Sequence, residues 1–105
     1  DEFAVLLSNC PLAQAEAIAE KLRSAVVAYE LLWEGHVFGV GASIGLVPVD
    51  ASYATAADVL RAADAACYTA KRQGRNCVAV QFRLRLHTSA ATADTCGVAI
   101  DVPSR

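Results

Sequence analysis

The amino-acid sequence predicts an α+β fold, in which helices pack on an antiparallel β-sheet. Two observations support this prediction. Apolar residues recur at helical spacing over two long segments, residues 11–29 and 55–73. Short apolar or alternating segments lie before, between and after these helices and give the order β-α-β-β-α-β. The chain has 105 residues, so we expect one domain at most.

The first strand and the first helix follow each other directly. Residues 3–7 form a continuous apolar run, which is typical of a strand buried on both faces. Ser8 to Cys10 interrupt this run, and Pro11 suits the first position of a helix, where a missing N–H costs nothing. Residues 31–33 are again apolar, and Glu34-Gly35 resembles a tight connection, which indicates a short strand before the next one.

The next strand is predicted over residues 38–46, where apolar side chains alternate with small residues. One face of this strand is apolar, and the other carries Gly39, Gly41 and Gly45 and is nearly bare. A helix or another backbone can therefore approach that face closely. Pro48 is expected to close the strand.

The second helix has clear signals at both ends. Thr55 is a predicted N-cap, with Asp58 three residues later, and Gly74 is a natural C-terminal stop. Residues 78–86 then alternate as a strand with one polar face. Residues 88–97 are small and polar and indicate a loop, and residues 98–102 are expected to form a further short strand.

The composition describes an apolar chain with little net charge. Hydrophobic residues make up 55% of it and charged residues 19%, with a mean hydropathy of +0.36. A net charge of −2 gives no overall attraction to nucleic acid or to a membrane surface, so phosphate binding must depend on local cations. No apolar run approaches the roughly 20 residues of a membrane span, and no membrane segment is predicted.

The cysteines indicate neither a metal site nor a disulfide framework. Cys10, Cys67, Cys77 and Cys96 form no CxxC pair, and the chain has only 2 histidines. An even number of cysteines could form disulfides in a secreted protein, but we expect no signal peptide. Cys67 also fits a helical stripe as a small apolar residue. We therefore expect reduced thiols and a cytoplasmic location.

Three groups of residues are candidates for chemistry. Asp1 and Glu2 stand at the mouth of a strand, where carboxylates can hold Mg²⁺, although they can also be solvated charges. Lys71 and Arg75 could clamp a polyphosphate, although cations at a helix C-terminus also complement the helix dipole. Ser43 has no nucleophile-elbow motif around it, and the glycines beside it are interpreted as structural.

Three stretches taken in order resemble the GGDEF domain of bacterial diguanylate cyclases. They are DEFAVLL at 1–7, GASIGLVPV at 41–49 and VLRAADAACYTAKRQGRNCVAV at 59–80. The family reads G-G-[DE]-E-F, then S-I-G, then A-D-x-A-L-Y-x-A-K-x-x-G-R-N. Cys67 stands where the family often has Leu. The order and spacing of the three motifs make the resemblance far more specific than any one motif.

The resemblance implies a nucleotidyl-cyclase-like fold built on a ferredoxin-like palm. Residues 1–82 correspond to the C-terminal part of such a domain, which starts inside the GGDEF signature. Residues 83–105 are not accounted for and are predicted to be a strand extension and a mobile tail.

The family condenses two GTP molecules into cyclic di-GMP across a homodimer of domains, with Mg²⁺ or Mn²⁺. By resemblance, Asp1 is the metal ligand and a catalytic residue, and Glu2 is a second catalytic acid near the metal or the substrate. Lys71 and Arg75 match cations that contact the substrate phosphates. The motif residues Asp64 and Asn76 are interpreted as structural.

The resemblance also shows what the chain lacks. The Gly-Gly pair, the strand with the other metal-binding Asp, the guanine-contacting residues and the R-x-x-D inhibition motif all lie upstream in the family. We therefore expect the isolated chain to be inactive, and a sensory or receiver domain to precede it in the parent protein. The alternatives are a degenerate, non-catalytic GGDEF domain with a nucleotide-sensing or regulatory role, and an unrelated α+β interaction module.

Overall fold

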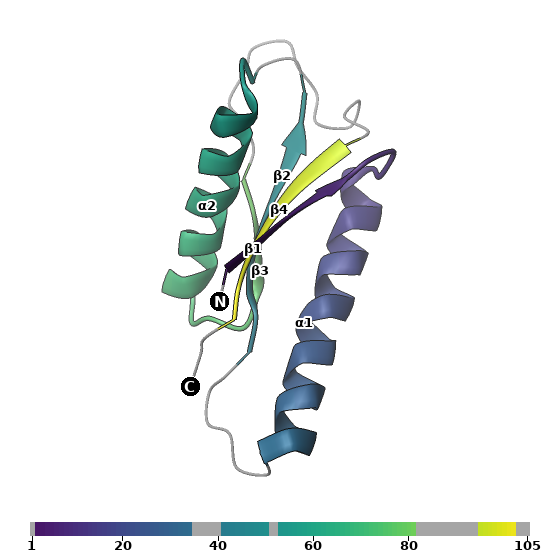
Figure 1. Ribbon diagram of the computed structural model, residues 1–105, viewed down its shortest axis with the longest axis vertical. Helices are drawn as coiled ribbons and strands as arrows, with labels where there is room; N and C mark the ends of the chain where they lie inside the picture. Colours follow the sequence, from purple (N-terminus) through teal and green to yellow (C-terminus); the bar gives the residue numbers. More distant parts are fainter. Residues whose placement is uncertain (1, 35–40, 51–52, 82–94, 103–105) are drawn as a thin grey trace.

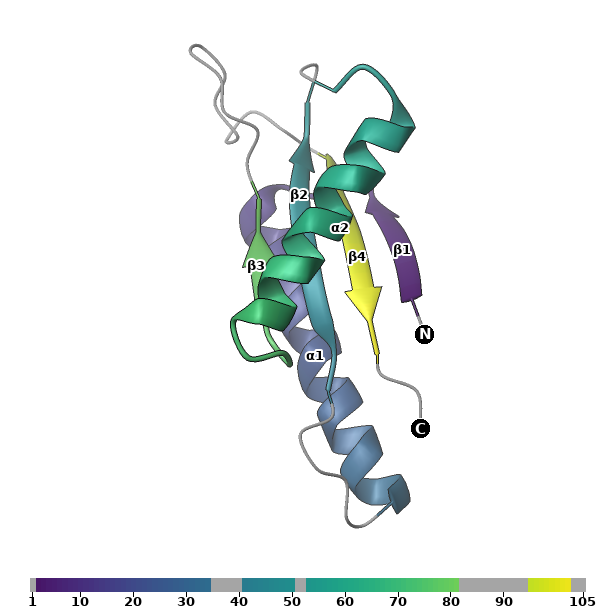
Figure 2. The ribbon, with the colours of Figure 1, turned by 90° about the vertical axis from the view of Figure 1, so that its left-hand side faces the viewer.

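The computed structural model describes residues 2–34, 41–50, 53–81 and 95–102. Its elements are β1 (Glu2–Leu7), α1 (Leu12–Glu34), β2 (Ser43–Val49), α2 (Ala56–Arg72), β3 (Val78–Val80) and β4 (Thr95–Asp101). The two helices lie on opposite faces of one sheet (Figure 1), and the side view shows α2 in front of the strands and α1 behind them (Figure 2). The predicted α+β class is confirmed.

The sheet has the strand order β1-β4-β2-β3. β4 runs antiparallel to both β1 and β2, whereas β3 runs parallel to β2. The sheet is therefore mixed, where the sequence predicts an antiparallel one. The reason is the connection: α2 crosses over between β2 and β3, and a helical crossover returns the chain in the same direction.

The predicted order β-α-β-β-α-β differs from the observed order β-α-β-α-β-β. Residues 31–33 belong to α1, which continues to Glu34, and residues 35–40 lie outside the described part of the chain. A three-residue apolar run cannot by itself distinguish a helical turn from a strand. Of the strand predicted over residues 78–86, the structure describes β3, and residues 82–86 lie outside the description.

The sequence also predicts that the strand over residues 38–46 is closed by Pro48. This is wrong, because the observed strand, β2, continues to Val49. Pro48 pairs with Cys96 of β4, but the pairing of β2 with β3 ends at Leu46. Since no strand in the described chain requires an N–H from Pro48 on that side, the proline is tolerated.

β4 occupies the middle of the sheet. The sequence predicts a short strand over residues 98–102, and the structure has a longer strand that lies between β1 and β2. Val98 stands opposite Val5 on one side and Leu46 on the other, and it is buried. In the described part of the chain, β1 is joined to the rest of the sheet through β4.

Two apolar clusters fill the spaces on either side of the sheet. The cluster on the α1 side contains Cys10, Ala15, Ala19, Ala42, Ile44, Leu46, Cys96 and Val98. The cluster on the α2 side contains Val47, Ala63, Ala66, Cys67 and Ala99. Successive β2 residues thus alternate between the clusters, as a two-fold strand repeat requires.

Gly45 lets α2 lie directly against β2. A Cβ at this position would overlap the backbone of α2 at Ala63 and Cys67 and would lie 2.8 Å from the carbonyl carbon of Ala66. The thiol of Cys67 also donates a hydrogen bond to the carbonyl oxygen of Ser43, at 3.2 Å. The close approach predicted from the bare face of this strand is therefore confirmed.

We expect Gly45→Ala to destabilise the chain strongly, because the added methyl group meets helix backbone that cannot move aside. Overpacked cores typically lose about 1–3 kcal/mol, and we expect at least that. Urea unfolding followed by circular dichroism measures the change, with Gln14→Ala on the exposed face of α1 as the control. Equal stability of Gly45→Ala and the control would contradict the close packing.

β1 exposes apolar side chains at one edge of the sheet. Phe3 is 54% exposed and Leu6 64%, and the strand pairs on one side with β4. Exposed apolar edge strands are templates for pairing with other chains.

Among the described helices, none is long and apolar enough to cross a membrane.

We therefore predict that the purified chain self-associates. Leu6→Lys should shift it toward the monomer, because a charge on an edge strand opposes strand pairing between molecules. Sedimentation velocity measures the distribution, and Gln14→Lys adds the same charge on α1 as a control. A monodisperse wild-type monomer, or an equal effect of both variants, would contradict this prediction.

Candidate functional site

α2 has the cap and the stop predicted for it, and the predicted cations lie at its C-terminal end. Thr55 caps the N-terminus, and its side-chain oxygen accepts a hydrogen bond from the Asp58 N–H at 3.1 Å, as predicted. At the other end, the Arg75 N–H bonds to the Ala70 carbonyl at 3.0 Å, and Gly74 has a φ of 119°. This is the Schellman arrangement with glycine just past the cap, and it confirms the predicted stop.

Lys71 lies in the last turn of α2 and forms an ion pair with Asp101 of β4. The lysine side chain is 27% exposed and the aspartate side chain 19%. The hydrogen bond that Lys71 donates to the Asp101 carboxylate is the main cause that raises the pKa of Lys71 above its usual value, and burial opposes this shift. At neutral pH, Lys71 is therefore a charged ammonium group that already has a partner.

A cavity of about 270 Å³ surrounds this ion pair. Its lining consists of Glu2, Phe3, Asp64, Cys67, Tyr68, Lys71, Ala99, Ile100 and Asp101. Glu2 and Asp101 stand opposite each other across β1 and β4. The cavity therefore brings together two residues that the sequence nominated, Glu2 from the first motif and Lys71 from the last.

The other two predicted residues are not part of this cavity as described. Asp1 lies outside the described residues. Arg75 is exposed and follows the end of α2, and it does not line the cavity. Its φ of 65° and that of Asn76, 48°, place both residues in the left-handed region, so the chain turns sharply here. The role of Arg75 as a phosphate contact stays a prediction.

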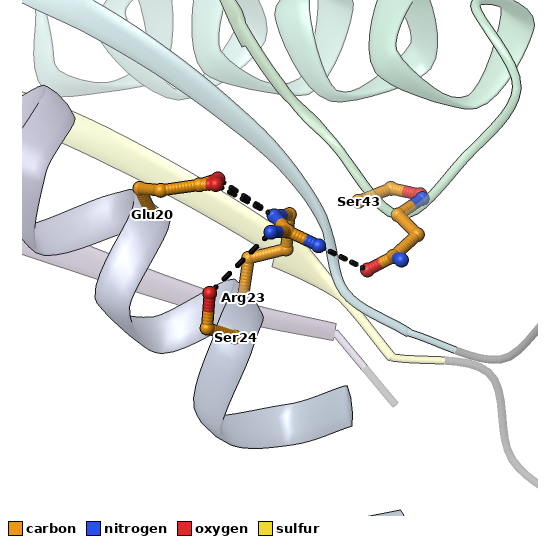
Figure 3. A network of polar contacts seen from close by, with 5 residues as sticks. Glu20, Arg23, Ser24 and Ser43 are labelled. Atoms are coloured by element: carbon orange, nitrogen blue, oxygen red, sulfur yellow. Dashed lines mark hydrogen bonds and ion pairs between the residues drawn. The ribbon is translucent and has the colours of Figure 1, made fainter. Parts of the chain in front are cut away.

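A polar network anchors this turn to the rest of the fold (Figure 3). Arg23 of α1 donates to the Asn76 side-chain oxygen at 3.2 Å and to both carboxylate oxygens of Glu20, at 2.6 and 2.9 Å. The Asn76 N–H bonds to the hydroxyl oxygen of Ser43 at 3.3 Å. The side chain of Asn76 also lies directly against Gly41. Asn76 and Ser43 thus make structural contacts.

The sequence pattern does not indicate that Arg23 holds the turn after α2. Arg23 and Glu20 lie off the apolar stripe of the first helix, where charged residues are usually solvated. Their hydrogen bond lowers the pKa of the Glu20 carboxyl. The i, i+3 spacing of Glu20 and Arg23 predicts an ion pair between them on the helix. No local pattern indicates that the same arginine also contacts Asn76.

A bound metal ion would have to rely on few protein ligands. Among the described residues, no group of three or more His, Cys, Asp or Glu side chains is arranged to hold a metal. Mg²⁺ often takes only one or two carboxylates together with substrate phosphates, so this observation does not conflict with a site shared with a nucleotide. Glu2 is the carboxylate nearest in sequence to Asp1 that could support such a site.

A larger, apolar cavity of about 600 Å³ lies between β1, β4 and the start of α2. Leu6, Val59 and Gly97 are among its lining residues. It contains none of the residues nominated from the sequence. We therefore place the candidate site at the smaller cavity, where the charged residues meet.

The sequence profile described as "Diguanylate cyclase, GGDEF domain" matches residues 1–77. This match covers well over half of the chain and includes Glu2, Lys71 and Arg75. The chain therefore belongs to the GGDEF domain family of diguanylate cyclases, as its motifs predict.

Curated relatives agree with this assignment. The chain is 45% identical over 80 residues to the probable diguanylate cyclase DgcE of Escherichia coli, which covers 76% of the chain and 7% of the relative. It is 33% identical over 76 residues to diguanylate cyclase A of Treponema denticola, covering 72% of the chain and 20% of the relative. The chain thus spans a small part of the relatives' length. No solved structure matches it significantly.

The Lys71–Asp101 pair predicts a pH-dependent contribution to stability. The pKa of Lys71 is higher in the folded state than its usual value, so the stabilisation is complete at neutral pH and disappears as the pH rises through the folded pKa. Lys71→Met should cost about 1 kcal/mol at pH 7, because this partly exposed ion pair is screened by solvent.

Urea unfolding at neutral and at strongly alkaline pH measures this difference. The difference in free energy of unfolding between wild type and Lys71→Met should become smaller at alkaline pH. The difference between wild type and Lys21→Met, a substitution at an exposed position on α1, should not change. If the difference between wild type and Lys71→Met stays constant with pH, the ion pair is not the cause of that difference.

Proposed function

We propose that the chain is the C-terminal part of a diguanylate cyclase domain, which condenses two GTP molecules into cyclic di-GMP in bacterial signalling. The observation that supports this most directly is the cavity in which Glu2 of the GGDEF motif meets Lys71 of the last motif. These residues are 69 positions apart in sequence. Their convergence gives the family motifs a common site.

The roles follow from charge and position. Lys71 supplies a point charge for a substrate phosphate, and Arg75, on the adjoining turn, supplies a fork that can hold further phosphate oxygens. Asp1 directly precedes Glu2, and we assign it as the catalytic acidic residue and ligand of Mg²⁺ or Mn²⁺. When bound, the metal ion stabilises negative charge on the reacting phosphate. We assign Glu2, the next residue of the motif, as a second catalytic acid near the metal or the substrate.

The reaction requires more than this chain supplies. Each GTP reacts with the other across a homodimer of domains, and guanine recognition depends on family residues that have no match here. The chain spans 7% and 20% of the lengths of the two relatives. We therefore propose a cytoplasmic parent protein in which an upstream sensory or receiver domain controls the cyclase, and an isolated chain that is inactive.

A non-catalytic GGDEF domain is the second candidate, and one observation favours it. Lys71 is already paired with Asp101, and the cavity around it contains the carboxylates of Glu2 and Asp64 as well. A domain that senses a nucleotide or contacts a regulatory partner could keep this arrangement without turnover.

Cyclic di-GMP formation distinguishes the candidates. The purified 105-residue chain should form none from GTP and Mg²⁺, and detectable product would contradict the proposed inactivity of this chain. A longer parent protein that contains a complete domain should be active. There, Asp1→Ala should abolish activity, and Lys71→Ala should raise KM for GTP.

The matched control in the parent protein is Lys21→Ala. Lys21 is an exposed residue of α1, the helix on the face of the sheet opposite α2 (Figure 1). This substitution should leave turnover unchanged. A folded parent protein without activity, in wild type and all variants, would establish the non-catalytic alternative.

A further inference from the structure

Asp101 reaches the candidate site from outside the family match. The match ends at residue 77, and Asp101 is the last residue of β4. β4 lies between the two strands that carry the first and second motifs (Figure 2). In the strand register Asp101 stands opposite Glu2 on one side and Ser43 on the other. Its backbone is therefore held in place from both sides.

This placement makes the cavity unfavourable for an anion. In the described part of the chain, the lining includes the carboxylates of Glu2, Asp64 and Asp101 and a single cation, Lys71. These negative charges oppose the entry of a phosphate group, and the one attractive charge is already engaged by Asp101. An incoming phosphate must therefore displace the Asp101 carboxylate from Lys71.

We propose that Asp101 is an intramolecular competitor that lowers the affinity of the Lys71 site for phosphate-containing ligands. A carboxylate attached to a fixed strand acts at a high effective concentration, because it does not lose translational freedom on pairing. β4 thus has two roles, as an interior strand of the sheet and as the carrier of an inhibitory charge. This inference rests on the proposed role of Lys71 in phosphate binding.

Calorimetric titration of the 105-residue chain with inorganic pyrophosphate tests the proposal. Asp101→Asn removes the charge but keeps the shape of the side chain, and it should tighten binding about two- to fivefold, as expected for release of a partly exposed ion pair. Asp64→Asn removes an equal charge from the same cavity without releasing Lys71, so it should have a smaller effect.

Combining the substitutions isolates the role of Lys71. The gain from Asp101→Asn should disappear in a background of Lys71→Met, as a double-mutant cycle would reveal. Circular dichroism establishes that each variant folds, and Asp101→Ser replaces Asp101→Asn if the amide disturbs the strand. Equal tightening by Asp101→Asn and Asp64→Asn would overturn the proposal, because it would reflect only the total charge.

A second measurement separates failure of the proposal from failure of the proposed function. The rate at which an amine-reactive ester labels Lys71, followed by mass spectrometry, should rise in Asp101→Asn. Without the carboxylate the Lys71 ammonium group loses its proton more easily, and the neutral amine is the form that reacts. Faster labelling without any Lys71-dependent pyrophosphate binding would refute phosphate binding at Lys71, and the competition with it. Lys71-dependent binding in wild type that Asp101→Asn does not tighten would refute the competition alone.

Discussion

The position of β4 is the constraint on which the remaining structure depends. In the described chain β1 and β2 do not pair with each other, and β4 supplies the hydrogen-bonding partner for both. Its buried residues Cys96 and Val98 belong to the core on the α1 side, and Ala99 belongs to the core on the α2 side. A segment outside the family match therefore joins the parts of the chain that carry the family motifs.

Local signals in the sequence predicted the elements that local physics determines. The cap at Thr55, the stop at Gly74 and the bare strand face at Gly45 all require particular residue types, and each was found as expected. The end of the first helix was missed, because the apolar residues 31–33 fit a helical turn as well as a strand. The central place of β4 was not predictable, since pairing between distant strands leaves no mark in the local pattern.

The candidate site shows the same division. Glu2 and Lys71 could be nominated from their motifs, and the fold brings them to one cavity. Asp101 was overlooked because it closes an apolar run in a segment without any motif, and Arg23 because its partner, Asn76, lies 53 residues away. Both contacts form only when distant segments fold together. A sequence pattern can identify which residues are suited to a chemistry, but their charge balance emerges from the tertiary structure.

The close contact between Gly45 and α2 also determines how near Lys71 lies to Asp101. Gly45 fixes the spacing between β2 and the part of α2 that contains Ala63 and Cys67. Lys71 follows Cys67 by one helical turn on the same face, so its ammonium group moves with that spacing. A bulkier residue at position 45 would lift the helix and separate Lys71 from Asp101. The missing side chain at Gly45 thus keeps α2 close enough to the sheet for Lys71, one turn beyond Cys67, to pair with Asp101.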